Sequence, residues 1–351
     1  MSETKRSSFL SKFPGPDSET SGIPPGNEVT AERLLSEKLS PLIIRPAMDG
    51  ISLIDWARAN RSLIETELLQ HGAILFRGFR GLRVQAFQTF AEATSSNGLI
   101  DYKFRSTPRK EVSGKIYTST EYPASQSIPL HNEMSYARNW PMKIWFHCVK
   151  PAMQGGATPI ASSARVFQRI AEAVRAKFIR HGIMYVRNYH EGIDLSYKEV
   201  FGTANRAEIE GFCREAGIEC EFGGGVQLRT RQRCQAVSVH PTTGDTVWFN
   251  QAHLFHTSSL DPAYSGPLLA LYGKDRIPRN CYYGDGSEIG EADLGEVREA
   301  YRQEMVSFPW HTGDVLMLDN MLVAHGRESF AGERQVVVAM AEETSLSERA
   351  R

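Results

Sequence analysis

Apolar residues recur along this chain at two different periods, and the change of period predicts where helices and strands lie. From 52 to 70 they return every three or four positions, which predicts an amphipathic helix that ends at Gly72. Residues 84–91 repeat the helical period. The continuous apolar run 73–76, between the two helices, predicts a buried strand.

Short apolar or alternating runs make up most of the remaining pattern. Residues 143–149 alternate as a strand does, and Gly155-Gly156 then predicts a turn. Further strands are predicted at 183–186, 224–231, 236–240, 246–250, 315–318 and 336–340, and further helices at 206–216 and 294–305. Many short strands, with helices grouped toward the amino end and in insertions, predict a mainly β fold with flanking helices, built as an antiparallel double-sheet barrel.

Composition divides the chain into an arm and a domain. Residues 1–27 are rich in Ser, Pro, Gly, Glu and Lys, and we expect them to form a disordered amino-terminal arm. Residues 28–351 are expected to form a single domain, because the candidate chemical groups described below extend from 131 to 325 and must meet in space.

Charge and cysteine usage narrow the class of protein. A hydrophobic fraction of 41% and a charged fraction of 23% are ordinary for a soluble globular protein. The formal net charge of -1 gives no reason to expect nucleic acid or an acidic membrane as partner. Five scattered cysteines without a Cys-x-x-Cys pair, and no secretory signal or long apolar span, favour a cytoplasmic location.

The stretch 128–136, Ile-Pro-Leu-His-Asn-Glu-Met-Ser-Tyr, carries the first candidate chemistry. On an extended strand His131 and Glu133 would leave the same face and could bind one metal ion. A second imidazole would complete the two-histidine, one-carboxylate set that holds non-haem Fe(II). By itself the pair also fits a strand with two polar residues on its exposed face.

A second histidine lies far downstream. Residues 313–327 read Gly-Asp-Val-Leu-Met-Leu-Asp-Asn-Met-Leu-Val-Ala-His-Gly-Arg, an apolar strand that runs toward His325. Arg334 follows nine residues later, and Thr158, in Gly-Gly-Ala-Thr, stands 27 residues after His131.

Together these residues resemble the taurine dioxygenase and clavaminate synthase-like Fe(II)/2-oxoglutarate oxygenases, over about 72–340. Within that family, the segments 131–136, 248–256 and 313–320 resemble the branch that contains the aspartyl hydroxylase of syringomycin biosynthesis. The resemblance implies a double-stranded β-helix, or jelly roll, with its metal at the open end.

The resemblance also implies a set of roles. His131, Glu133 and His325 would be the catalytic metal ligands for Fe(II). Thr158 and Arg334 would hold the far carboxylate of the cosubstrate 2-oxoglutarate, for which a guanidinium offers a planar fork. With O2 as the second cosubstrate, the enzyme would form succinate while it hydroxylates an aliphatic carbon of its substrate.

The branch resemblance implies a small-molecule substrate from secondary metabolism, such as antibiotic biosynthesis. This would be an amino acid or a derivative, either free or bound to a carrier protein. Two alternatives stay open: an oxygenase that acts on a sulfonate or another small carboxylic acid in catabolism, and a non-catalytic ligand-binding barrel. A halogenase is disfavoured, since halide would need the position that Glu133 occupies.

Several residues near the proposed ligands have competing interpretations. Arg327, two residues after His325, is a rival to Arg334 for the cosubstrate carboxylate, although a five-carbon diacid should reach beyond the immediate surroundings of the metal. Asp319 and Asn320 either orient His325 or form a turn.

Substrate contacts are predicted from two further segments. Asn250 and Gln251 end a strand and either contact substrate or form a turn. Arg229, Arg231 and Arg233 alternate on one predicted strand face, which either binds a carboxylate or phosphate or belongs to a solvated edge strand. We take Arg231 as the candidate substrate contact of the three.

Two other features are less specific. His253 and His256 have helical spacing, but no carboxylate stands at a matching distance, so roles in packing or in a substrate channel are favoured over metal binding. Residues 117–127 precede the metal-binding stretch and are either a lid over the site or an ordinary surface loop.

Overall fold

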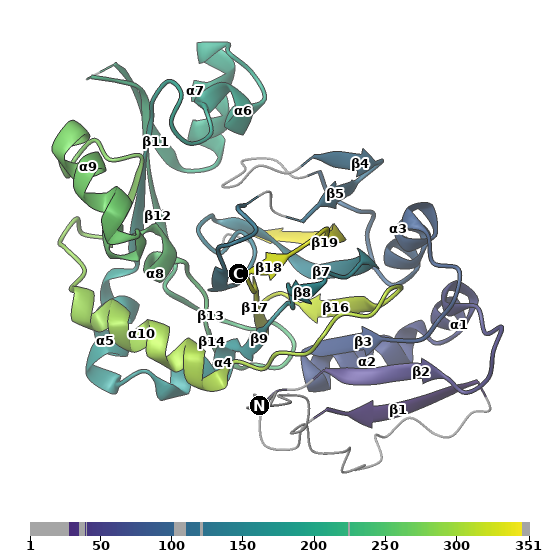
Figure 1. Ribbon diagram of the computed structural model, residues 1–351. Coiled ribbons are helices and arrows are strands. Elements are labelled where there is room, and N and C mark those ends of the chain that lie inside the picture. Colours follow the sequence, from purple (N-terminus) through teal and green to yellow (C-terminus); the bar gives the residue numbers. More distant parts are fainter. Residues whose placement is uncertain are drawn as a thin grey trace, which may run out of the picture.

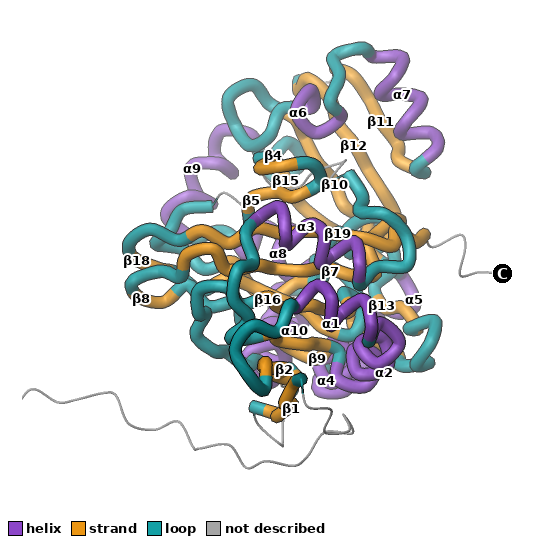
Figure 2. Tube along the Cα trace, turned by 90° about the vertical axis from the view of Figure 1, so that its right-hand side faces the viewer, coloured by secondary structure: helices purple, strands orange, loops and turns teal. Residues whose placement is uncertain are grey.

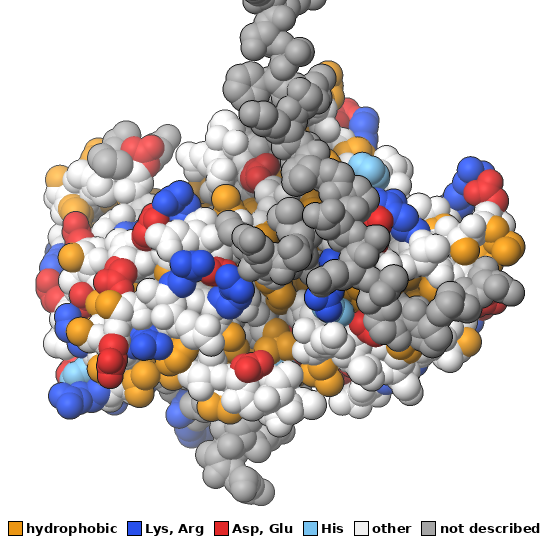
Figure 3. All heavy atoms as spheres, turned by 90° about the horizontal axis from the view of Figure 1, so that it is seen from below, with side chains coloured by type: hydrophobic (Ala, Val, Ile, Leu, Met, Phe, Trp, Pro, Cys, Tyr) orange, Lys and Arg blue, Asp and Glu red, His pale blue; other side chains and the backbone are white. Residues whose placement is uncertain are grey.

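The computed structural model describes residues 28–34, 39, 41–101, 110–119, 122–223 and 225–345, without the side chains of 262–264. The arm predicted over 1–27 lies outside the described residues. No helix within the described ranges combines the length and the apolar character needed to cross a lipid bilayer. Positive and negative side chains lie interspersed on the face shown in Figure 3.

Among the described residues, the largest sheet has eight strands in the order β1-β2-β3-β16-β7-β19-β5-β4. Its strands are β1 (Val29–Arg33), β2 (Leu42–Pro46), β3 (Ala73–Phe76), β16 (Val315–Asp319), β7 (Asn139–Lys150), β19 (Gln335–Ser345), β5 (Ile116–Thr118) and β4 (Glu111–Ser113). β7 spans 12 residues and pairs antiparallel with β16 and with β19 (Figure 1). These three strands form the centre of the sheet.

Shorter strands form a second layer against this sheet. They are β6 (Ile128–His131), β17 (Val323–Arg327) and β9 (Ile160–Ser162) in one sheet, β18 (Phe330–Ala331) with β8 (Gln154–Gly155), and β13 (Val237–Val239) with β14 (Thr246–Trp248). Ile144 and Phe146 of β7, Leu316 of β16, Ile160 of β9 and Val323 of β17 share one buried core. The two layers therefore enclose apolar side chains, as the predicted jelly roll requires.

Helices cover the other face of the large sheet. They are α1 (Leu53–Ala59), α2 (Arg61–His71) and α3 (Val84–Ala93). The predicted helix over 52–70 is thus two helices, which meet at Asn60; Ser52 caps the first through a bond from Asp55 N, and Gly72 ends the second with φ 69°. A Cβ on Gly72 would lie 2.6 Å from Val323 Cγ2, so glycine permits a close approach of α2 to β17.

A four-stranded sheet, in the order β11-β12-β10-β15, extends from the barrel (Figure 1 and Figure 2). Its strands are β10 (Ile183–Tyr189), β11 (Ile218–Gly223), β12 (Val226–Cys234) and β15 (Arg279–Tyr283). The remaining helices are α4 (Ser163–Arg169), α5 (Glu172–His181), α6 (Tyr197–Phe201), α7 (Arg206–Glu215), α8 (Ala252–Phe255), the 3-10 helix η1 (Thr257–Ser259), α9 (Pro262–Tyr272) and α10 (Glu291–Glu304).

The arginine strand lies inside this extension. Arg229, Arg231 and Arg233 do share the more exposed face of β12, as predicted. However, β12 pairs with β11 on one side and β10 on the other, so the alternative of an edge strand is wrong. The sequence predicts which side chains share a face of β12, but it does not predict how many strands pair with β12.

Candidate metal and cosubstrate site

Two histidines meet across a pair of antiparallel strands. His131 ends β6 and lies directly opposite His325 of β17, and the centroids of their rings are 4.7 Å apart. The register shifts between His325 and Arg327, and a Cβ on the intervening Gly326 would lie 2.6 Å from Ile128 O. Glycine at 326 therefore permits the strands to approach closely beside the two histidines.

Glu133 reaches the same point, but not from a strand. β6 ends at His131, and residues 133–136 form a turn in which Met134 has φ 57°. The expectation that an extended strand places His131 and Glu133 on one face is therefore wrong. The turn instead carries the buried Glu133 carboxylate to 3.9 Å from His325 Nε2.

The three side chains form a group that could hold a metal ion. One ligand atom from each of His131, Glu133 and His325 lies within 4.8 Å of the other two. His131 Nδ1 is 2.9 Å from Pro129 O, so this nitrogen carries the proton, and Nε2 keeps its lone pair for a metal. Two imidazoles and a carboxylate that converge from one side are the donor set preferred by non-haem Fe(II).

A small cavity of about 30 Å³ adjoins this group. Besides the two histidines it is lined by Ser119, Ile128, Phe146, Thr158, Gly326, Arg327, Arg334 and Val336. Thr158 and Arg334, the predicted cosubstrate residues, thus share one cavity with the histidines. Thr158 Oγ1 accepts a hydrogen bond of 3.0 Å from Trp310 Nε1, which orients the hydroxyl.

Arg334 is held by the glycine turn that precedes Thr158. Its Nε donates to Gly156 O at 2.8 Å, and its Nη1 lies 3.4 Å from Ser119 Oγ. Burial, and then the nearby charge of Arg327, lower the pKa of Arg334 to about 10. Gly156 has φ 74°, and a Cβ there would lie 3.0 Å from Arg334 Cδ, so the predicted turn also makes room for this side chain.

Arg327 lines the same cavity but is bonded differently. Its Nη1 donates to Tyr122 O at 3.0 Å, and its Nη2 donates to Pro123 O at 2.7 Å and Gln126 O at 2.8 Å. The guanidinium therefore fixes the loop 122–126 beside the site. Of the stretch 117–127 considered as a lid, Tyr117 and Thr118 belong to β5, and 120–121 lie outside the described residues.

His253 of α8 and His256, the C-cap of α8, do not belong to the group of possible metal ligands. His253 is buried, and its Nε2 donates to Leu130 O at 2.9 Å, next to His131. Burial lowers the pKa of His253 to about 3. His256 Nδ1 accepts from Ser258 N at 3.1 Å, and burial lowers its pKa too. These contacts indicate a role in packing for His253 and a role in helix capping for His256.

The predicted substrate residues make contacts with other residues of the protein. Asn250 is fully buried, donates to Ala236 O at 2.7 Å and accepts from Ala252 N at 3.0 Å, which is the strand-end turn considered as the alternative. Gln251 Nε2 donates to Asn132 O at 2.8 Å. Arg231 lies 3.7 Å from Glu221 Oε2.

Phe146 and Trp310 were missed by the sequence reasoning, which considered Ser119 only as part of the candidate lid 117–127. Phe146 packs beside His325 with ring centroids 4.9 Å apart, and the alternation of β7 could have placed it on the inner face. Ser119 and Trp310 lie in irregular segments, where no periodicity shows which way a side chain points.

Known proteins resemble this chain in sequence and in fold. The model of the family described as "Taurine catabolism dioxygenase TauD, TfdA family" matches residues 36–340. The chain is 40% identical over 308 residues to the dapdiamide synthesis protein DdaC of Enterobacter agglomerans, covering 85% of this chain and 93% of DdaC. It is 29% identical over 308 residues to a clavaminate synthase-like protein of Arabidopsis thaliana, covering 84% and 89%.

Solved structures share the fold. PvcB from Pseudomonas aeruginosa matches with a TM-score of 0.53 and 16% identity, covering 92% of this chain and 93% of PvcB. A taurine dioxygenase from Burkholderia xenovorans matches with a TM-score of 0.52 and 17% identity, covering 91% and 92%. The jelly-roll prediction is thereby confirmed, and the chain belongs to the TauD, TfdA family of Fe(II)/2-oxoglutarate-dependent dioxygenases.

Proposed function

We propose that His131, Glu133 and His325 bind Fe(II) and that Thr158 and Arg334 bind the far carboxylate of 2-oxoglutarate. The observation that carries this proposal is the arrangement of the five residues around one point: three ligand atoms within 4.8 Å of one another, beside a cavity that Thr158 and Arg334 line. When bound, iron and 2-oxoglutarate would supply the oxidation: one oxygen atom of O2 enters the substrate, the other enters succinate, and the carboxyl group next to the keto carbon leaves as CO2.

The contacts of the neighbouring residues position these groups. Pro129 O holds His131 in the tautomer that offers Nε2, and Phe146 packs beside His325. Trp310 fixes the hydroxyl of Thr158, and Gly156 O holds Arg334 by its Nε. Thr158 and His325 are buried, and burial strengthens electrostatic contacts compared with water.

The substrate that we propose is an amino acid or a close derivative, hydroxylated at an aliphatic carbon in secondary metabolism. Support comes from the 40% identical relative, whose name assigns it to dapdiamide synthesis. The resemblance of 131–136 and 248–256 to the syringomycin aspartyl hydroxylase branch points the same way.

The proposed reaction is tested by mass spectrometry. Free amino acids, their amide-linked derivatives and carrier-bound amino acids are each offered to the Fe(II)-loaded enzyme with 2-oxoglutarate. We expect one class to gain the mass of one oxygen atom, with succinate formed in equal amount. Product from sulfonates alone would overturn the amino-acid assignment.

Carrier binding is a separate part of the proposal. The exposed face of β12 offers Arg231 and Arg233 to an anion such as a pantetheine phosphate, although Glu221 and Glu219 lie beside them. The same amino acid is compared free and bound to its carrier. Equal turnover of the two forms would reject a requirement for the carrier.

A further inference from the structure

Glu133 lies in the turn that follows β6, outside the described strands. The turn follows β6, includes the positive φ of Met134, and is closed by bonds from Ser135 N to Asn132 O at 3.3 Å and from Ala137 N to Met134 O at 2.9 Å. Neither bond involves Glu133. A metal ligand must be held closely in place, so the contacts of this peptide unit matter for the site.

Asn320 makes those contacts. Its Oδ1 accepts from Glu133 N at 2.7 Å, and its Nδ2 donates to Glu133 O at 3.0 Å. One primary amide thus binds both backbone groups of the same residue, although 187 positions separate the two residues. The same Nδ2 also donates to Pro141 O at 2.8 Å. Asn320 itself is fully buried.

The neighbouring residue of the turn is fixed from the same side. Asn132 Nδ2 donates to Asn320 O at 2.7 Å and to Ser163 Oγ at 2.9 Å. The backbone and the side chain of Asn320 therefore hold Asn132 and Glu133, the two residues between His131 and Met134. An amide is suited to this because it offers one acceptor and two donors at fixed angles.

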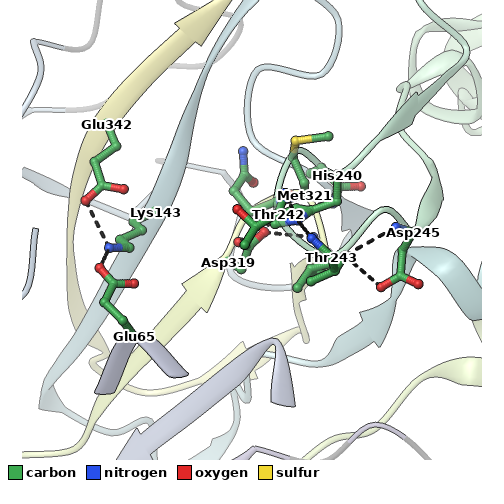
Figure 4. A network of polar contacts seen from close by, with 12 residues as sticks. Glu65, Lys143, His240, Thr242, Thr243, Asp245, Asp319, Met321 and Glu342 are labelled. Atoms are coloured by element: carbon green, nitrogen blue, oxygen red, sulfur yellow. Dashed lines mark hydrogen bonds and ion pairs between the residues drawn. The ribbon is translucent and has the colours of Figure 1, made fainter. Parts of the chain in front are cut away.

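Asp319 fixes Asn320 in turn. Its Oδ1 accepts from Met321 N and from Leu322 N, both at 2.9 Å, and so closes the turn between β16 and β17. Its Oδ2 lies 3.0 Å from His240 Nε2, and His240 Nδ1 accepts from Thr243 N at 3.1 Å (Figure 4). Because His240 Nδ1 is an acceptor, His240 Nε2 carries the proton that it donates to Asp319.

We propose that Asn320 is a positioning residue, which fixes the Glu133 carboxylate relative to the two histidines and thereby sets the affinity of the site for its metal. This inference rests on the proposed role of Glu133 as a metal ligand. From the sequence, Asn320 was expected either to orient His325 or to form a turn, whereas its side chain bonds to the backbone of Glu133.

The test compares Asn320→Ala with Asn188→Ala. Asn188 is a matched control, because it is also buried and its side chain makes three hydrogen bonds, to Asp275 O, Ile277 O and Arg229 Nε. Each variant is titrated anaerobically with Co(II) by calorimetry, and its folded fraction is measured by circular dichroism. We expect Asn320→Ala to weaken Co(II) binding by about 10- to 100-fold, and Asn188→Ala to leave it unchanged.

A second variant covers the case in which Asn320→Ala does not fold. Asn320→Asp keeps the size and the acceptor for Glu133 N but loses the donors to Glu133 O and Pro141 O. We expect it, too, to bind Co(II) at least about tenfold more weakly than the natural protein. Co(II) affinity equal to that of the Asn188→Ala control in the folded Asn320 variants would overturn the proposal.

A double variant separates this inference from the proposed metal site. Glu133→Ala alone should weaken Co(II) binding, and adding Asn320→Ala to it should weaken binding no further, because the position of a carboxylate that is absent cannot matter. If Glu133→Ala binds Co(II) normally, the metal assignment itself fails. If Glu133→Ala fails to bind while Asn320→Ala binds normally, only the positioning role fails.

Discussion

Arg327 and Arg334 line one cavity, yet their bonds assign them different tasks. Arg327 donates to three carbonyls of the loop 122–126, whereas Arg334 is anchored by its Nε to Gly156 O and by a longer contact to Ser119. The Nη groups of Arg334 therefore remain the better candidates for a carboxylate beside Thr158. The cosubstrate role predicted for Arg334 stays a prediction that a binding measurement can decide.

Arg334→Ala should weaken 2-oxoglutarate binding by about 2–5 kcal/mol, the cost of removing one partner of a buried charge pair. Arg327→Ala should weaken it much less, because its main bonds hold a loop. The measurement is calorimetric titration of the Co(II)-loaded protein with 2-oxoglutarate. A larger loss in Arg327→Ala than in Arg334→Ala would show that the two arginines are assigned in the wrong order.

His253 should make stability depend on pH. Burial lowers its pKa to about 3, from about 6.5 in an unfolded chain, so between these values the unfolded state binds a proton that the folded state does not. The contribution of His253 to the free energy of unfolding is therefore complete above about pH 6.5. As pH falls below this value, the contribution is lost at up to about 1.4 kcal/mol per pH unit.

Urea unfolding at about pH 7 and about pH 5 measures this effect. Between about pH 7 and about pH 5, the free energy of unfolding of the natural protein should fall by about 2 kcal/mol more than that of His253→Gln. Identical losses in both proteins would mean that His253 is protonated in the folded state as readily as in the unfolded one.

At the scale of elements, the apolar strands were the most predictable parts. The run 73–76 is β3 as predicted, and 315–318 and 336–340 lie within β16 and β19. Strands β4 and β5 were missed, since three residues are too few to show a period. The site residues beyond His131 and Glu133 were predicted from the family resemblance, whereas no local pattern links Asn320 to the turn that carries Glu133.

Gly156, in the turn between β8 and β9, leaves space for the side chain of Arg334, and a substitution can test this role. Gly156→Ala should weaken 2-oxoglutarate binding, because the new Cβ would lie 3.0 Å from Arg334 Cδ and from Phe330 Cβ. Gly202→Ala is the matched control: Gly202 has φ 70°, similar to the φ of 74° at Gly156, but its Cβ would meet nothing within 4 Å.

Both glycine variants should lose about 1 kcal/mol or more of stability through backbone strain. Only Gly156→Ala should raise the dissociation constant for 2-oxoglutarate, measured by the same calorimetric titration. Equal affinities in the two variants would show that Arg334 does not need the space beside Gly156.

At the scale of the whole molecule, the metal group joins parts of the chain that are far apart in sequence. His131 and His325 come from β6 and β17, so the group exists in the folded state and not in the unfolded chain. A ligand that binds only the folded state stabilises that state by about 2.7 kcal/mol when the ligand concentration is about one hundred times the dissociation constant.

Co(II) should therefore raise the melting temperature of the natural protein. In His131→Ala, Glu133→Ala and His325→Ala the rise should disappear, while the melting temperature without metal stays close to that of the natural protein. Scanning calorimetry with and without Co(II) measures both quantities. A full rise in any one variant would remove that residue from the metal site.

The position of β19 has a consequence for how the protein is made. Of the described strands, β19 is the nearest to the carboxyl end of the chain, yet it lies between β7 and β5 in the large sheet. While the ribosome is still producing this segment, one edge of the 12-residue strand β7 has no partner. An open strand edge invites pairing with other chains, so a nascent or prematurely terminated chain should depend on chaperones until β19 has emerged.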